Sequence, residues 1–204
     1  MASGKPKMTR VFVIAGSIVL IALLAFFLPQ FNKKSDTIKI GISQIVEHPA
    51  LDASKAGFIQ RLAELGFEEG ENIEFIDENA QGDMAIAQSI AAKLISDDVD
   101  LILAIATPTA QAAAQATKDI PIVITAVTDP VAAGLVNSTA NPGANVTGTS
   151  DLTPVKKQLE LLKKILPDAK QVGVLYNAGE TNSVVQVEIA RDASSKLDLE
   201  LVEV

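Results

Sequence analysis

The chain has 204 residues, of which 48% are apolar but only 4% aromatic, and this aliphatic composition favours an α/β fold. It contains no cysteine, which excludes disulfides, thiolate metal sites, a cysteine nucleophile and a lipid-modified cysteine. The net charge is −8, with +4 in residues 1–36 and −12 in residues 37–204, and an acidic body argues against binding to nucleic acid.

An uncharged stretch, Val11–Asn32, dominates the N-terminal part of the chain, and Val11–Leu28 is almost wholly aliphatic or Phe. As a helix, residues 11–28 would be about 27 Å long, which is enough to span a bilayer. Basic residues precede the stretch, so a signal peptide and an anchor would both send residues 37–204 outside. At the end of the apolar run, residues 28–36 read LPQFNKKSD, in place of the small residues that a signal peptidase requires. We therefore favour an uncleaved transmembrane anchor with a linker in residues 1–36 over a cleaved signal segment.

Strands and helices are predicted to alternate through the rest of the chain. The strands are expected at 38–43, 73–77, 101–106, 120–127, 171–176 and 200–204, and the helices at 49–66, 84–96, 109–118, 154–166 and 183–197. The runs at 101–106 and 120–127 are continuous apolar stretches, which are typical of parallel strands buried on both faces. This pattern predicts a doubly wound α/β fold with a parallel sheet and right-handed crossovers.

Polar residues follow the two continuous runs, at the carboxyl ends of strands, where open parallel sheets bind their ligands. The candidate residues are Thr107 and Thr109 after the first run, and Ala126, Thr128 and Asp129 at the end of the second. Hydroxyl groups and the free N–H groups of a helix start suit a small ligand with a carboxylate. Helix capping is the alternative role for the two threonines after the first run and for Asp129.

Four further residues are singled out by their positions at or near the ends of strands. Gln44 follows the first strand at the same edge. No local structural role, such as helix capping, accounts for a glutamine there, so we place it in the ligand cleft. The only histidine, His48, is expected to cap a helix start, since a lone histidine makes neither a metal site nor a catalytic triad. Asn177 follows the next-to-last strand, where the neighbouring Tyr176 would either stack on an aromatic ligand or join the core.

Five segments of residues 37–204, taken together and in order, resemble a known family. They are SQIVEHPALDASKAGF (43–58), ENAQGD (78–83), the stretch 101–130, NPGANVTGTSD (141–151) and VGVLYNAGETNS (172–183). With them the chain resembles the extracytoplasmic substrate-binding proteins of ABC importers, in the tryptophan and aromatic amino-acid family. The resemblance implies a two-lobed receptor with the periplasmic-binding-protein fold, type I, which closes on its ligand and presents it to a membrane permease.

Set against the family pattern, the chain divides into three parts. The anchor segment precedes a ligand-binding first lobe, complete or nearly so, over residues 37–150, and only part of a second lobe over residues 151–204. Two strands and two helices make a thin second lobe, because small units bury too little surface to be stable alone. The chain is therefore expected to be either a fragment or a natural truncation. Ser150, Asp151 and Asn177 are expected to form the second jaw of the site.

The expected function is the binding of an amino acid, such as tryptophan, by the extracytoplasmic component of an ABC importer. The alternative is the ligand-sensing ectodomain of a membrane signalling system, which would use the same fold and anchor. Enzymatic activity is not expected, because the chain has no cysteine, one histidine and no serine in a recognisable nucleophile turn. We expect neither a metal ion nor another cofactor, and without a GxGxxG or Walker sequence nucleotide binding has little support.

Overall fold

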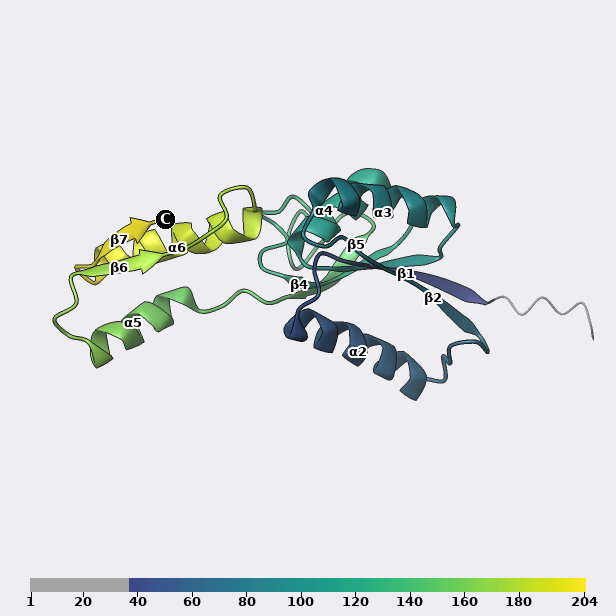
Figure 1. Ribbon diagram of the computed structural model, residues 1–204, viewed down its shortest axis with the longest axis horizontal. Coiled ribbons are helices and arrows are strands. Elements are labelled where there is room, and N and C mark those ends of the chain that lie inside the picture. The colour runs from purple at the N-terminus through teal and green to yellow at the C-terminus, as the bar shows by residue number, and fades with distance from the viewer. Residues whose placement is uncertain (1–36) are drawn as a thin grey trace, which may run out of the picture. The chain divides into compact units, whose positions relative to one another are not determined.

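A five-stranded parallel sheet organises residues 38–150 of the computed structural model, which describes residues 37–204. The strands lie in the order β2-β1-β3-β4-β5, and every neighbouring pair is parallel (Figure 1). Their bounds are β1 Ile38–Gln44, β2 Ile73–Asn79, β3 Leu101–Ile105, β4 Ile122–Val127 and β5 Val146–Ser150. The predicted parallel sheet is confirmed, although β4 begins two residues later than expected and β5 was not expected as a strand.

Helices cover both faces of this sheet (Figure 1). Helix α2 (Pro49–Glu64) packs on one face, while α3 (Met84–Ser96) and α4 (Thr107–Ala116) pack on the other. Within β3, Leu103 belongs to the core cluster under α2, and its neighbour Ile102 belongs to the cluster under α3 and α4. Because alternate side chains of the strand enter two different cores, β3 needs an apolar residue at every position. This explains the continuous run and confirms the doubly wound arrangement.

Local caps fix where the helices after β1 and β2 begin. The Nδ1 atom of His48 accepts a hydrogen bond from the N–H of Ala50 at 3.2 Å, so the predicted capping role of this histidine is confirmed. Asp83 caps α3 in the same way, because its Oδ1 accepts from the N–H groups of Ala85 and Ile86 at 2.6 and 3.1 Å. These caps therefore set the first residues of α2, Pro49, and of α3, Met84.

Residues 151–204 contain a second sheet with its own helices. Strands β6 (Gln171–Val174) and β7 (Glu200–Glu203) form a two-stranded parallel sheet. Helices α5 (Val155–Ile165) and α6 (Thr181–Lys196) pack with it around a small core cluster of Leu159, Ala190 and Ala193. The alternation of strand and helix predicted for this part of the chain is confirmed, with β6 ending two residues earlier than expected.

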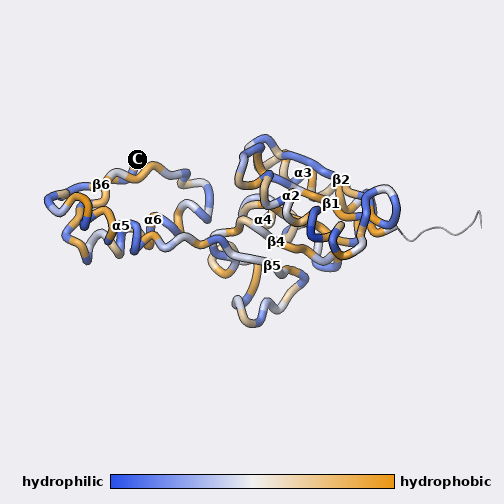
Figure 2. The backbone as a smooth tube through the Cα atoms, turned by 90° about the horizontal axis from the view of Figure 1, so that it is seen from below, coloured by the Kyte–Doolittle hydropathy of each residue, from blue (hydrophilic) through white to orange (hydrophobic). Residues whose placement is uncertain are grey.

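Several large apolar side chains of this second part remain exposed to solvent. Leu175 is 85% exposed, Ile165 68% and Leu166 58%. In the first part, by contrast, Ile42, Ile102 and Ile122 of the central strands are fully buried, and apolar (orange) stretches alternate with polar (blue) stretches along the chain (Figure 2). The two-stranded sheet and its helices therefore bury their apolar side chains less completely than the five-stranded sheet does.

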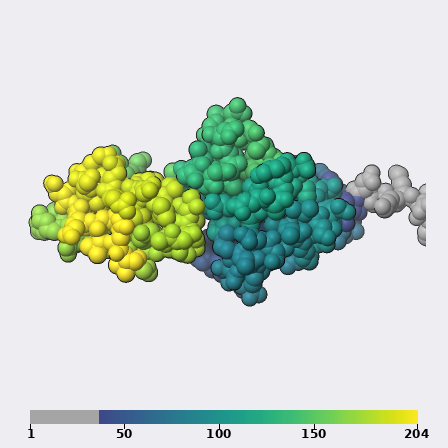
Figure 3. Space-filling view, turned by 90° about the horizontal axis from the view of Figure 1, so that it is seen from above, coloured from purple at the N-terminus to yellow at the C-terminus, as the bar shows by residue number. Residues whose placement is uncertain are grey.

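The loop between β4 and β5 projects from the surface of the molecule as a green bulge (Figure 3). It begins with hydrogen-bonded turns, in which the N–H of Ala133 donates to the carbonyl of Asp129 at 2.9 Å. None of the helices in residues 37–204 combines the length and the hydrophobicity that a membrane span needs. The anchor predicted in residues 1–36 lies outside the described residues.

Candidate ligand-binding site

The strand order reverses between β1 and β3, and this switch point is where open α/β sheets leave a crevice for a ligand. From β1 the chain passes to β2 on one side and then returns to β3 on the other, with Gln44 and Ile105 paired at the carboxyl ends of β1 and β3. The predicted residues Gln44 and Thr107 therefore lie on neighbouring strand ends at the switch point.

Buried polar atoms without a protein partner lie at this edge of the sheet. They are Oγ of Ser43, Oε1 of Gln44 and Oγ1 of Thr107, whose residues are 1%, 1% and 2% exposed. A buried polar group without a partner costs about 1–3 kcal/mol, so its presence in a folded protein needs a reason. A polar ligand bound at the switch point would supply a partner to Gln44 and Thr107, whereas the side chain of Ser43, which precedes Gln44 in β1, lies on the opposite face of the sheet. The sequence placed Ser43 with Gln44 at the ligand-binding edge of the first strand, although only Gln44 was among the predicted site residues.

Two alanines next to this edge have backbone conformations that alanine rarely adopts. Ala106, directly after β3, has φ +84°, and Ala126, within β4, has φ +54°. Such conformations cost about 1–3 kcal/mol each and gather at ligand-binding positions. At Ala126 the pairing of β4 with β5 shifts register, so that Val127 rather than Ala126 faces Ser150. The distortion changes the direction in which the chain leaves β4 toward Thr128.

Thr109 is fully buried, but its hydroxyl is already engaged by the backbone. The Oγ1 atom lies 2.7 Å from the carbonyl oxygen of Ile105 and 3.0 Å from that of Ala106. Since the hydroxyl has one proton, it is shared between these two acceptors and holds the turn from β3 into α4. The backbone therefore occupies the hydroxyl of Thr109, which leaves it less available to a ligand, but Thr109 does not cap the N–H groups of α4.

Asp129 is likewise used locally. Its Oδ1 accepts hydrogen bonds from the N–H groups of Val131 and Ala132 at 2.9 and 3.0 Å, which closes a turn after β4, where the structure has turns in place of the helix that Asp129 was expected to cap. Thr128 before it is buried, and its carbonyl accepts the hydroxyl hydrogen of Ser150 at 2.7 Å. Ser150 therefore ties the end of β5 to the loop after β4.

Asp151 and Asn177 are both exposed. The backbone N–H of Asp151 donates to the carbonyl of Val127 at 3.1 Å, which continues the pairing of β5 with β4. The side chain of Asn177 closes a turn, since its Oδ1 accepts from the N–H of Gly179 at 3.0 Å and its Nδ2 donates to Glu180 at 2.9 Å. The structure therefore uses the backbone of Asp151 in the pairing of β5 with β4 and the side chain of Asn177 in a turn.

Tyr176 belongs to a polar network of the second sheet. Its hydroxyl donates to Oε2 of Glu203 at 3.3 Å, and the guanidinium of Arg191 donates to Oε1 of the same carboxylate at 2.6 and 2.9 Å. The hydrogen bond to Glu203 raises the pKa of Arg191 above its ordinary value. A cavity of about 240 Å³ lies beside this network, lined by Tyr176, Gln158 and Ser183 among others.

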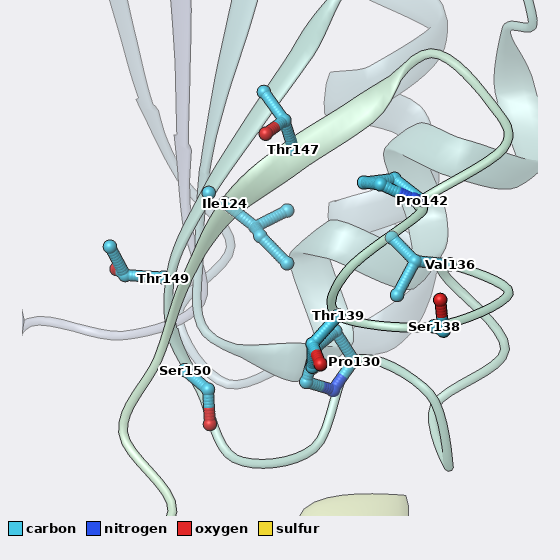
Figure 4. Close-up of a pocket in the computed structure, with 10 residues that line it drawn as sticks. Ile124, Pro130, Val136, Ser138, Thr139, Pro142, Thr147, Thr149 and Ser150 are labelled. Carbon is cyan, nitrogen blue, oxygen red and sulfur yellow. The ribbon is translucent and has the colours of Figure 1, made fainter.

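A second cavity of about 270 Å³ lies between β5 and the loop that precedes it (Figure 4). Ile124, Pro130, Val136 and Pro142 give it apolar walls, and Ser150 is the predicted site residue that lines it. It does not include Gln44 or Thr107. Within residues 37–204 no group of three or more His, Asp or Glu side chains is placed to hold a metal ion.

Comparison with known proteins identifies the family. The sequence model of the family described as ABC transporter substrate binding protein matches residues 39–204, and the chain belongs to this family. A curated tyrosine-binding protein of Clostridioides difficile (strain R20291) is 55% identical over 175 residues, which are 84% of this chain and 51% of that protein. The resemblance stated from the sequence is confirmed.

Two solved structures show the same fold at high similarity. A conserved domain protein from Vibrio cholerae is 52% identical, with a TM-score of 0.81. An ABC domain from Streptococcus pneumoniae in complex with L-Trp is 39% identical, with a TM-score of 0.79. Each comparison covers 82% of this chain and 57% of the other. The fold is that of the type I periplasmic-binding proteins, and the chain spans about half the length of the relatives it matches.

Proposed function

We propose that the chain binds an aromatic amino acid, such as tryptophan or tyrosine, as the extracytoplasmic substrate-binding component of an ABC importer. Its family membership supports the transport role, and the relatives that bind tyrosine and L-Trp support the ligand class. The observation that carries the proposal is the pair of buried, unpartnered polar atoms at the switch point, Oε1 of Gln44 and Oγ1 of Thr107.

These two atoms offer complementary chemistry to an amino acid. A threonine hydroxyl can donate to a carboxylate, and the first turn of α4, which starts at Thr107, has N–H groups without intrahelical acceptors. The positive end of the helix adds about 0.3–1 kcal/mol for a nearby carboxylate. The carbonyl oxygen of Gln44 only accepts, so it suits the protonated amine of the same ligand.

We further propose that residues 37–150 form the first lobe and residues 151–204 part of the second. The separate core cluster of the two-stranded sheet supports this division. Ala126, Thr128, Ser150 and Asp151 would then complete the site from the β4 and β5 ends, with Asn177 on the second jaw. A permease in the membrane is the proposed partner, and residues 1–36 are the proposed anchor to the membrane.

We propose a binding role without catalysis. The single histidine, His48, uses its ring nitrogen to cap α2, and the chain has no cysteine. The hydroxyl of Ser150, next to the cavity beside β5, donates to a backbone carbonyl and has no general base among its bonded partners. The groups at the switch point hold a polar ligand but have no nucleophile–base pair with which to transform it.

Fluorescence gives a direct test, because the chain has no tryptophan and only one tyrosine. Added tryptophan is therefore the main source of emission when the detergent-solubilised full chain is titrated. Competition with tyrosine, phenylalanine, leucine and arginine then ranks the ligands. The proposal predicts that the aromatic amino acids bind at least about tenfold more tightly than leucine or arginine. Equal affinities, or no binding of tryptophan at millimolar concentration, would contradict it.

A further inference from the structure

The side-chain amide of Gln44 is held in one orientation by two acceptors. Its Nε2 lies 2.9 Å from the carbonyl oxygen of Val46 and 2.7 Å from Oδ1 of Asp52. An amide nitrogen has two N–H donors, whereas a carbonyl and a carboxylate only accept. Turning the amide over would bring Oε1 against both acceptors, so that two hydrogen bonds would become two repulsive contacts. Asp52 and Val46 together therefore determine that Oε1 is the side-chain atom of Gln44 without a protein hydrogen-bond partner.

The unpartnered atom, Oε1 of Gln44, is a hydrogen-bond acceptor at the switch point. Oε1 of Gln44 is buried and has no protein partner, and the residue ends β1 beside the end of β3. Because the opposite orientation is excluded, this position can be satisfied only by a donor, such as an N–H group or a protonated amine. A ligand that places only a carboxylate or another pure acceptor at this position would leave the buried oxygen unsatisfied.

Asp52 is well placed to keep this arrangement rigid. It lies in the first turn of α2, where its own N–H donates to the carbonyl of His48 at 2.9 Å, and His48 caps the same helix. The carboxylate is therefore carried by a fixed helix start rather than by a mobile loop. Its partner, Gln44, is fixed in turn by the strand pairing of β1.

We propose that Asp52 is a positioning residue that makes this site select ligands with a protonated amine over otherwise identical acids. The proposal rests on the proposed function, because it assigns a determinant of specificity within that same site. Asp52 does not need to touch the ligand. It acts through Gln44, by ensuring that the amide presents its oxygen and not its nitrogen to the ligand.

The test compares two ligands that differ only in the amine, tyrosine and 3-(4-hydroxyphenyl)propanoate, by calorimetry on the full chain. Asp52→Ala should weaken tyrosine binding about tenfold and leave the amine-free acid within about twofold of wild type. Asp52→Asn should restore most of the lost affinity for tyrosine, because an asparagine can still present an oxygen to Nε2 of Gln44.

The matched control is Asp77→Ala. It removes a carboxylate of β2 that pairs at 2.8 Å with Lys55, which lies in α2 as Asp52 does. The control should change neither affinity.

A second measurement needs no ligand. In wild type both side-chain amide protons of Gln44 are hydrogen-bonded, so NMR should show them exchanging more slowly than those of the exposed Gln60, and Asp52→Ala should reduce the difference, because one of the two acceptors is lost. Equal losses for both ligands, failure of Asp52→Asn to restore binding, or fast exchange at Gln44 in wild type would each overturn the positioning role. Those outcomes leave the proposed function intact, whereas a wild-type chain that binds no aromatic amino acid overturns both.

Discussion

Gln44 of β1 is the ladder partner of Ile105 of β3, so these strands end side by side at the edge that carries the candidate site. Thr107 and Thr109 follow Ile105 at the start of α4, and both are buried. Their hydroxyls differ in one respect. That of Thr107 has no partner, while that of Thr109 is 2.7 Å from the carbonyl of Ile105. The two threonines thus form a matched pair, one free to bind a ligand and one occupied by the fold.

Replacing Thr107 by valine removes one hydroxyl at nearly constant shape. We expect Thr107→Val to weaken tryptophan binding about ten- to hundredfold, the effect of losing a hydrogen bond to a charged group. The melting temperature should stay the same or rise, because the hydroxyl has no partner to lose in the ligand-free protein. Fluorescence titration and a thermal melt of the same sample measure both quantities.

Thr109→Val is the control for that experiment. It should lower the free energy of unfolding by about 1 kcal/mol, because it removes a hydroxyl that bonds to the backbone, and it should change the affinity little. If Thr107→Val binds tryptophan as wild type does, or if the two variants behave alike, Thr107 is not part of the site.

Much of the fold was predictable because the central strands are buried on both faces. An apolar residue at every position of β3, in a run too short for a typical helix, is typical of a parallel strand buried on both faces. Strand β5 was missed for the opposite reason. It lies at the edge of the sheet, and of its five residues, Val146–Ser150, only Val146 is buried, so it has no apolar pattern.

The site was predictable only in part, because ligands and helix starts are served by the same residue types. Threonine and aspartate beside a strand end indicate either a ligand site or a cap. Only the structure shows whether the side chain is already hydrogen-bonded to the backbone. The side chains of Asp129 and Thr109 are hydrogen-bonded to the backbone, whereas Thr107 and Gln44 each have a side-chain atom without a partner. The unusual backbone of Ala106 and Ala126 gave no sequence signal, because such conformations are expected of glycine.

Gly148 provides a test of the β4–β5 register. It has φ +150°, and a Cβ atom added there would lie 2.0 Å from the carbonyl oxygen of Ile124, its ladder partner. Because this oxygen belongs to the backbone, the strands must separate to admit a methyl group. We expect Gly148→Ala to lower the free energy of unfolding by about 2–4 kcal/mol in urea denaturation.

The control for this prediction is Gly57→Ala. Gly57 lies within α2 with nothing close to an added Cβ, so alanine there should raise the free energy of unfolding by about 0.5–1 kcal/mol. A Gly148→Ala variant as stable as wild type would show that the close pairing of β5 with β4 does not persist in solution.

The uncharged stretch Val11–Asn32 leads to a prediction about cellular location. If it is an uncleaved anchor, the chain should remain in the membrane fraction, and protease added to cells with a permeable outer surface should remove residues 37–204. Fractionation, protease protection and sequencing of the mature N-terminus test this. Recovery of most of the protein in soluble form, with its N-terminus beyond residue 30, would identify the stretch as a cleaved signal.

The two sheets should differ in how readily they open. Within residues 37–204, strands β6 and β7 pair only with each other. Nearby Leu175, Ile165 and Leu166 are more than half exposed, so few buried contacts oppose local opening. We therefore expect the backbone amides of β6 and β7 to exchange with solvent faster than those of β3, whose apolar side chains are buried on both faces. Hydrogen exchange resolved along the chain by mass spectrometry measures the difference, and strand β1, also in the five-stranded sheet, is the internal reference.

Tryptophan should slow exchange at the ends of β1 and β3 if it binds at the switch point. Uniform protection from Ile38 through Val204 would show instead that the second sheet is as stable as the first, and that its exposed leucines are covered in solution.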